Sequence, residues 1–147
     1  MSIHFYLHII FSTHQQKPYL IEEPTREAMF ARLSDICNGL DSRCVIASGS
    51  DDHVHLLVEA SPDLTTDDLV TAIKSRSAAW LQERGGLYAD FDWQESCVVF
   101  SISREDVADV SNDLACQAFY HQKIDFKTEM GLILASQEIS FTDEIWE

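Results

Sequence analysis

The order of strand-like and helix-like segments constrains the fold of this chain more than any single motif does. Four short segments are rich in β-branched and aromatic residues, which favour strands, and two longer segments carry apolar residues at helical spacing. In chain order they are a strand at 3–13, a helix at 22–40, strands at 43–48 and 53–59, a helix from 65 to about 83, and a strand at 96–102. This β-α-β-β-α-β order predicts an α+β, ferredoxin-like sheet with its helices on one face.

The segment after the last predicted strand adds a further element. Ser103 and Asp106 resemble a helix capping box with Asp in place of Glu, and they predict an added C-terminal helix that reaches about residue 121. A length of 147 residues suits one domain with a real core, and no repeat, linker or low-complexity segment divides the chain. We therefore expect residues 1–147 to form a single domain.

The composition bears on both the location and the partners of the protein. No apolar run approaches the roughly 20 residues of a membrane helix, no basic stretch precedes the first apolar segment as in a secretory signal, and the four cysteines lack C-x-x-C spacing. These features predict a cytoplasmic, reduced protein. The 25 acidic residues outnumber the 10 Lys and Arg, for a formal net charge of -15, and the resulting field opposes nucleic-acid binding.

His53 and His55 form the most informative local motif. They lie in a predicted strand, where side chains alternate, so both imidazoles project from one face while Val54 packs on the other. Two nitrogen ligands on one rigid strand make half of a divalent-metal site. A bare His-x-His motif is common, however, and an exposed or hydrogen-bonded pair is the alternative interpretation. His8, on the first predicted strand, is interpreted as core or interface packing rather than as a ligand.

Several further motifs share their order and spacing with a known family. They are residues 8–13 and 52–58, then Asp68, Leu69, Val70, Ile73, Lys74 and Trp80 on the second predicted helix, residues 91–95 and 100–103, and finally Gln117, His121, Phe126, Glu129 and Trp146. In these motifs the chain resembles the small HUH single-tyrosine transposases, the insertion-sequence and REP-associated tyrosine transposase group. The resemblance covers nearly the whole chain.

The resemblance implies a reaction, a cofactor and partners. Members of the family cut and rejoin single-stranded or hairpin DNA through a covalent phosphotyrosine link, and a divalent metal polarises the scissile phosphate. In this chain the resemblance assigns the metal, Mg²⁺ or Mn²⁺, to His53, His55 and Gln117. It also implies a homodimer, in which the helix that carries the tyrosine serves the partner's metal site in several members.

The chain departs from the family pattern at the nucleophile. That pattern places the tyrosine four residues before the glutamine, and here this position is Asp113, so we expect no phosphotyrosine. Tyr120 is the nearest tyrosine, but on a helix it would lie roughly 10 Å farther along the axis. Because nucleophilic attack needs reacting atoms about 3–3.5 Å apart, Tyr120 could substitute only if the helix slid or the DNA strand took another path.

Asp113 has three interpretations from the sequence. As a ligand, it would complete a His-His-Asp metal set with His53 and His55. As a nucleophile toward phosphorus, it would favour a metal-dependent nuclease or phosphoesterase, because an acyl phosphate hydrolyses readily. As a solvated helix aspartate, it would have no role in the site.

Few cations remain to contact a DNA backbone. Lys74, Arg76 and Lys123 are the candidates for phosphate contacts, and a solvated surface cation is the alternative interpretation of each. We therefore expect a transposase-like protein that keeps the fold and the metal residues but has lost the nucleophile. The alternatives are the nuclease or phosphoesterase, an active enzyme that uses Tyr120, and a non-enzymatic dimeric binding or regulatory protein, which the acidity favours.

Overall fold

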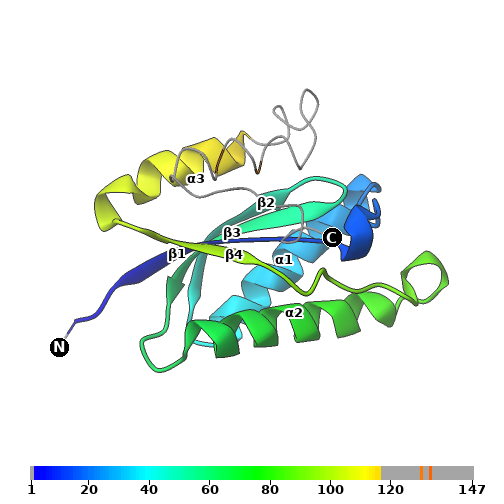
Figure 1. Cartoon of the computed structure of the whole chain (residues 1–147), viewed down its shortest axis with the longest axis horizontal. Coiled ribbons are helices and arrows are strands. Elements are labelled where there is room, and N and C mark those ends of the chain that lie inside the picture. Colours follow the sequence, from blue (N-terminus) through cyan, green and yellow to red (C-terminus); the bar gives the residue numbers. More distant parts are fainter. Residues whose placement is uncertain (1, 117–129, 131–132, 134–147) are drawn as a thin grey trace.

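The computed structural model describes residues 2–116, 130 and 133, and its elements follow the predicted order (Figure 1). The strands are β1 (Phe5–Ser12), β2 (Arg43–Gly49), β3 (His53–Ala60) and β4 (Val98–Ile102), and the α-helices are α1 (Glu23–Gly39), α2 (Thr66–Gln82) and α3 (Val107–Ala115). Three short 3-10 helices are η1 (His14–Gln16), η2 (Gly86–Tyr88) and η3 (Arg104–Asp106). None of the helices in the described part of the chain is long and apolar enough to cross a membrane.

The four strands form one antiparallel sheet in the order β2-β3-β1-β4. β1 and β3 therefore lie in the middle of the sheet, and β2 and β3 form the predicted hairpin. The register of the two central strands places Ser12 opposite His53 and Ile10 opposite His55. This element order and topology confirm the predicted α+β, ferredoxin-like class.

Helices cover both faces of the sheet. α1 and α2 lie on one face, and the added helix α3 lies on the opposite face (Figure 1). The core beneath α1 and α2 takes Ile9, Phe11, Val54, Leu56 and Val58 from the central strands and Met29, Leu33, Leu69, Ile73 and Leu81 from the two helices. Because side chains alternate along a strand, the residues between these, including Ile10 and both histidines of β3, project to the α3 side.

Local sequence explains where α2 begins and ends. The Thr65 hydroxyl accepts a hydrogen bond from the backbone N–H of Asp68 at 3.0 Å, which caps the helix. Asp67 and Asp68 place negative charge in the first turn, where the helix dipole is positive. Gly85 follows the helix with a φ of 68°, a left-handed conformation that residues with a Cβ rarely adopt.

The third helix begins later than the sequence predicts. Ser103 does not form a capping box, because its hydroxyl bonds the Asp106 carboxylate at 2.8 Å and the chain makes the 3-10 turn η3 before α3 begins. Among the described residues, α3 ends at Ala115 with Cys116 as its C-cap. The rest of the predicted helix, to about residue 121, lies outside the described residues.

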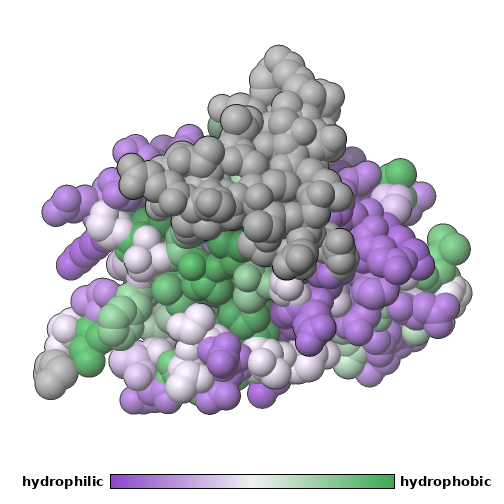
Figure 2. Space-filling view, in the orientation of Figure 1, coloured by the Kyte–Doolittle hydropathy of each residue, from purple (hydrophilic) through white to green (hydrophobic). Residues whose placement is uncertain are grey.

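The β4 edge of the sheet carries an apolar surface. Figure 2 shows apolar side chains gathered over this edge, where Val98, Phe100 and Ile102 are half-buried. Within the described residues, β4 is an outer strand of the sheet and pairs with β1 on its inner side.

Candidate metal centre

His53 and His55 lie side by side on the α3 side of the sheet. Both are fully buried, and their ring centroids are 5.1 Å apart with an interplanar angle of 68°. Val54, between them, packs in the core on the other face. The predicted alternation is therefore confirmed, and β3, a central strand paired on both sides, holds the two imidazoles close together.

Asp52 and Ser50 orient the His53 ring. The Nδ1 atom of His53 lies 2.7 Å from Oδ1 of Asp52 and 3.1 Å from Oγ of Ser50, and the Ser50 hydroxyl donates to the same carboxylate oxygen at 3.1 Å. Because an ionised carboxylate only accepts hydrogen bonds, the imidazole donates to it through Nδ1–H. Nε2 is then the nitrogen through which His53 would coordinate a metal. Carboxylate–histidine pairs of this kind are common around protein metal sites.

His8 of β1 lies beside His55. Its Nε2 atom is 2.9 Å from Nδ1 of His55, and the ring centroids are 5.2 Å apart. The His8 ring is also near Phe100 of β4, at a centroid distance of 6.3 Å, and the residue is buried. This burial agrees with the interpretation of His8 as a packing residue. The contact with His55 is not predicted by the sequence, because it depends on how two strands distant in the chain align.

The donor atoms in this part of the sheet suit a divalent cation. Both imidazoles have Nδ1 engaged by a protein group, so Nε2 is the nitrogen through which each would coordinate a metal. Opposite His53, the Oγ atom of Ser12 is buried and has no hydrogen-bond partner among the described residues. A buried hydroxyl is costly unless it is bonded, so this position suits a water or phosphate oxygen beside the cation. Two imidazoles favour a transition-metal cation over Mg²⁺, which prefers oxygen ligands.

The described part of the chain does not supply a third ligand of the predicted kind. Residues 2–116, 130 and 133 contain no group of three His, Cys, Asp or Glu side chains that could hold a metal ion. Asp113 is exposed on α3 and is not brought into such a group with the two histidines, which agrees with a solvated helix aspartate. Gln117 and Tyr120, the other predicted site residues of this region, lie outside the described residues.

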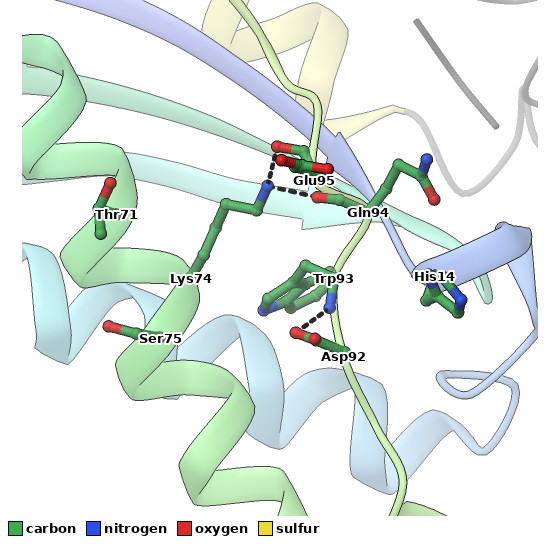
Figure 3. A pocket seen from close by; sticks show the side chains of 8 residues that line it. All are labelled: His14, Thr71, Lys74, Ser75, Asp92, Trp93, Gln94 and Glu95. Atoms are coloured by element: carbon green, nitrogen blue, oxygen red, sulfur yellow. Dashed lines mark hydrogen bonds between the residues drawn. The ribbon is translucent and has the colours of Figure 1, made fainter. Parts of the chain in front are cut away.

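Lys74 of α2 makes its contacts inside the protein. Its ammonium group donates to the backbone oxygens of Gln94 and Glu95, the second at 3.0 Å (Figure 3). It also lies 5.7 Å from the centroid of the Phe11 ring, and burial lowers the pKa of its ammonium group. These contacts tie α2 to the segment that leads into β4. They occupy two of the three donors of the ammonium group that the sequence assigns to DNA phosphates.

The pocket beside Lys74 carries acidic side chains at its rim. It has a volume of about 530 Å³ and is lined by His14, Thr71, Lys74, Ser75, Asp92, Trp93, Gln94 and Glu95 (Figure 3). Asp92 and Glu95 are exposed, and both carboxylates would repel a phosphate. Of the other two predicted phosphate contacts, Arg76 is exposed on α2 and Lys123 lies outside the described residues.

Three residues of the candidate metal centre are not singled out by the sequence as site residues: His8, Ser12 and Asp52. His8, Ile10 and Ser12 follow one another at every second residue of β1, so their common face could be read from the period of two. Asp52 directly precedes His53 and could be read as a turn residue only. The missing information in each case is the strand register, which sets the neighbours across the sheet.

Comparisons with known proteins agree with this fold. The sequence model of the family described as "Transposase IS200 like" matches residues 2–113, whereas no curated protein gives a significant match. Among solved structures, a candidate transposase from Deinococcus radiodurans R1 is 23% identical with a TM-score of 0.63, over 80% of this chain and 93% of that chain. A REP-associated tyrosine transposase bound to a REP hairpin is 12% identical with a TM-score of 0.60, over 82% of this chain and 70% of that chain.

The family match spans most of the chain. It extends over all four strands, includes both histidines of β3 and ends at Asp113. The two solved structures share the fold of the described residues at low sequence identity. This chain belongs to the IS200-like transposase family.

Proposed function

We propose that this protein binds a divalent metal at His53 and His55 and no longer forms the phosphotyrosine link of its family. One observation carries the proposal: the two imidazoles are buried side by side, with Nδ1 of one engaged by Asp52 and Nδ1 of the other by His8. Such contacts fix the orientation of a ligand ring before a metal binds, and the Asp52 carboxylate also fixes the tautomer of His53. Gln117 is the proposed third ligand.

The residues of this centre have separate tasks in the proposal. A bound divalent cation supplies polarisation of a phosphate oxygen. His53 and His55 hold that cation from one strand, and Asp52 keeps the proton of His53 on Nδ1. The buried Ser12 hydroxyl, opposite His53, is available to bond an oxygen next to the cation.

The proposed loss of the nucleophile rests on Asp113. It stands where the family resemblance places the tyrosine, and its carboxylate is exposed on α3. A carboxylate can attack phosphorus, but the acyl phosphate that forms hydrolyses readily, so it would not preserve a DNA end for rejoining. Water would release the DNA phosphate and regenerate the carboxylate, so this residue could support cleavage with turnover but not strand joining.

Single-stranded or hairpin DNA is the proposed nucleic-acid ligand, and we expect its affinity to be low. One structural neighbour is bound to a REP hairpin, which supports this class of ligand. The formal net charge of -15 and the internal contacts of Lys74 both act against phosphate binding.

The four cysteines are free thiols, in keeping with the proposed reduced, cytoplasmic location.

A homodimer is also proposed. The family resemblance implies it, and β4 is an outer strand of the sheet that pairs on one side only within the described residues, so its other edge could pair with a second copy. Sedimentation or light scattering at several protein concentrations tests this, and a monomer at all concentrations would contradict it.

A non-enzymatic binding or regulatory dimer is the second candidate function. It is favoured by the same two observations that oppose DNA binding, the acidic composition and the internal contacts of Lys74. It predicts no salt-sensitive DNA affinity at physiological ionic strength.

A nuclease or phosphoesterase that uses Asp113 would need this carboxylate near His53 and His55, and no contact among the described residues favours that arrangement.

Calorimetric titration of Mn²⁺ tests the metal site. The wild type is compared with His53→Ala and with His4→Ala, a control that removes a partly exposed histidine whose partner is Glu59. We expect the wild type and His4→Ala to bind the metal and His53→Ala to lose binding. Absence of binding by the wild type at millimolar Mn²⁺ would overturn the proposal and make the chain a transposase by ancestry only.

A denaturing gel tests the loss of the nucleophile. The protein is incubated with Mn²⁺ and with labelled hairpin and single-stranded oligonucleotides, and we expect no covalent protein–DNA adduct. An adduct that disappears in Tyr120→Phe would assign the nucleophile to Tyr120 and refute this part of the proposal. Cleavage without an adduct, lost in Asp113→Asn, would identify a nuclease instead.

A further inference from the structure

We propose that His8 is a positioning residue of the metal centre: it accepts the Nδ1–H of His55 and thereby holds His55 in the tautomer that coordinates through Nε2. This inference rests on the proposed metal site and assigns a role to a residue on a different strand from the two ligands. His8 itself is not a ligand in this arrangement, since the nitrogen that faces His55 is used in the hydrogen bond.

The geometry of the contact is that of a defined hydrogen bond. Nε2 of His8 and Nδ1 of His55 are 2.9 Å apart, within the range of a nitrogen donor and its acceptor. Both residues are buried, so water competes poorly for either nitrogen. The rings are tilted by 31°, which rules out simple face-to-face stacking as the reason for their proximity.

Strand register holds His8 in this position. In the pairing of β1 with β3, Ile10 lies opposite His55 and His8 lies opposite Leu57, so His8 is the diagonal neighbour of His55 on the same face. On its other side, β1 pairs with β4, where Phe100 lies opposite His8 and contacts its ring. A side chain between two paired strands has little freedom to leave the hydrogen bond.

The protons of the pair can be arranged in two ways, and only one is compatible with a metal. A neutral imidazole has one donor nitrogen and one acceptor nitrogen. If His8 donated from Nε2, then Nδ1 of His55 would be the acceptor and the His55 proton would sit on Nε2, which could not coordinate. If His55 donates from Nδ1, its Nε2 carries the lone pair for the metal, and the proton of His8 sits on Nδ1.

Metal binding therefore selects one tautomer of both histidines, and His8 makes that tautomer favourable by accepting its proton. Asp52 has the same task for His53, with a carboxylate in place of an imidazole. Removal of a group that holds a ligand histidine in this way lowers metal affinity by about 10–100-fold. We expect removal of His8 to lower the affinity by a factor in this range, because His55 would no longer be held in the coordinating tautomer.

The first test compares His8→Phe with His8→Gln in calorimetric titrations of Mn²⁺. Phe keeps an aromatic ring but removes the acceptor, whereas Gln retains an amide oxygen that can accept from His55. We expect His8→Phe to bind about 10–100-fold more weakly than the wild type and His8→Gln to recover most of that loss. Thermal unfolding of both variants without metal shows whether each is folded.

The second test needs no substitution. Nitrogen-15 NMR of the imidazoles in the wild type loaded with Zn²⁺, a diamagnetic probe, locates the proton on each ring. We expect His8 and His55 both protonated on Nδ1 and unprotonated on Nε2. A proton on Nε2 of His8 in the loaded protein would overturn the inference, whatever the two variants do.

The two proposals fail in different ways. If the wild type binds metal and His8→Phe binds equally well, the metal site stands and the role of His8 is refuted. If the wild type binds neither Mn²⁺ nor Zn²⁺, both are refuted together. If both variants lose affinity while NMR finds the expected tautomers, His8 is a positioning residue whose geometry glutamine does not reproduce.

Discussion

Replacement of Gly49 by alanine should disturb both the stability of the sheet and the metal centre. Gly49 is the last residue of β2, and the turn after it leads directly into His53. A Cβ at Gly49 would lie 2.2 Å from the backbone oxygen of His53 and 2.9 Å from Cα of Val54. Both are backbone atoms of a central strand, so no side-chain rotation can relieve the overlap, and the turn or β3 itself would have to move.

The expected magnitude follows from the kind of overlap. Extra methyl groups in well-packed regions cost about 1–3 kcal/mol, and we place Gly49→Ala at the upper end because the clash is with backbone. In chains of about this length each kcal/mol lowers the melting temperature by about 2–4 °C. A decrease of about 6–12 °C is therefore expected. Since His53 would shift with its backbone, the affinity for Mn²⁺ should decrease as well.

Thermal unfolding followed by circular dichroism checks this, with Gly39→Ala as the matched control. Gly39 is the last residue of α1, and an added Cβ there meets no atom within 4 Å. Alanine is also the better helix former by about 0.5–1 kcal/mol in a helix interior, so the control should melt at or slightly above the wild-type temperature. A Gly49→Ala protein that melts within about 2 °C of the wild type would refute the reasoning.

Three further outcomes are expected from the described contacts. Thr65→Ala removes the cap of α2 and should lower the free energy of unfolding in urea by about 1 kcal/mol, whereas Thr65→Ser should not. Phe11→Ala removes a fully buried ring packed edge-on against Trp93 at 4.7 Å and should cost about 3–5 kcal/mol; a smaller loss than for Thr65→Ala would contradict its place in the core. Hydrogen bonds from Arg43 and, second, from His4 lower the pKa of Glu59 from 4.5 to about 2. Because the folded value is the lower one, this stabilisation is present above pH 4.5 and is lost as the pH falls toward 2. Arg43→Gln should reduce the pH dependence of stability in that interval, and an unchanged profile would count against the ion pair.

The layers of the fold can be predicted from the sequence because buried apolar residues recur at a regular spacing, every second residue in the strands and every three to four residues in the helices. On β1, Ile9 and Phe11 alternate with residues that turn to the α3 side, and on β3, Val54 and Leu56 do the same. A two-sided pattern of this kind admits few arrangements once two helices must cover one face. The hairpin of β2 and β3 accounts for their pairing, whereas the position of β1 between β3 and β4 depends on the connections through α1 and α2.

The contacts of individual polar side chains cannot be predicted in the same way. Lys74 has the sequence context of a surface cation on an amphipathic helix, yet its ammonium reaches two carbonyl oxygens about twenty residues away in the chain. The hydrogen bond between His8 and His55 joins residues that are 47 positions apart. Both contacts depend on how separate elements are placed against each other, which residue type and local period do not encode.

The two parts of the proposed site differ in how strongly the fold depends on them. His53 and His55 are buried, and each is hydrogen-bonded to a neighbour, so replacing either would remove one of these hydrogen bonds at a cost of about 0.5–1.5 kcal/mol. Asp113 is exposed on α3, where most substitutions change stability by less than about 0.5 kcal/mol. If the nucleophile stood at this position, it could be lost without harm to folding, whereas the histidines would be retained for stability alone. The proposed combination of a lost nucleophile and retained histidines is therefore one that the stability of the fold alone would favour, and a measured metal affinity, rather than the presence of the histidines, is the test of a working site.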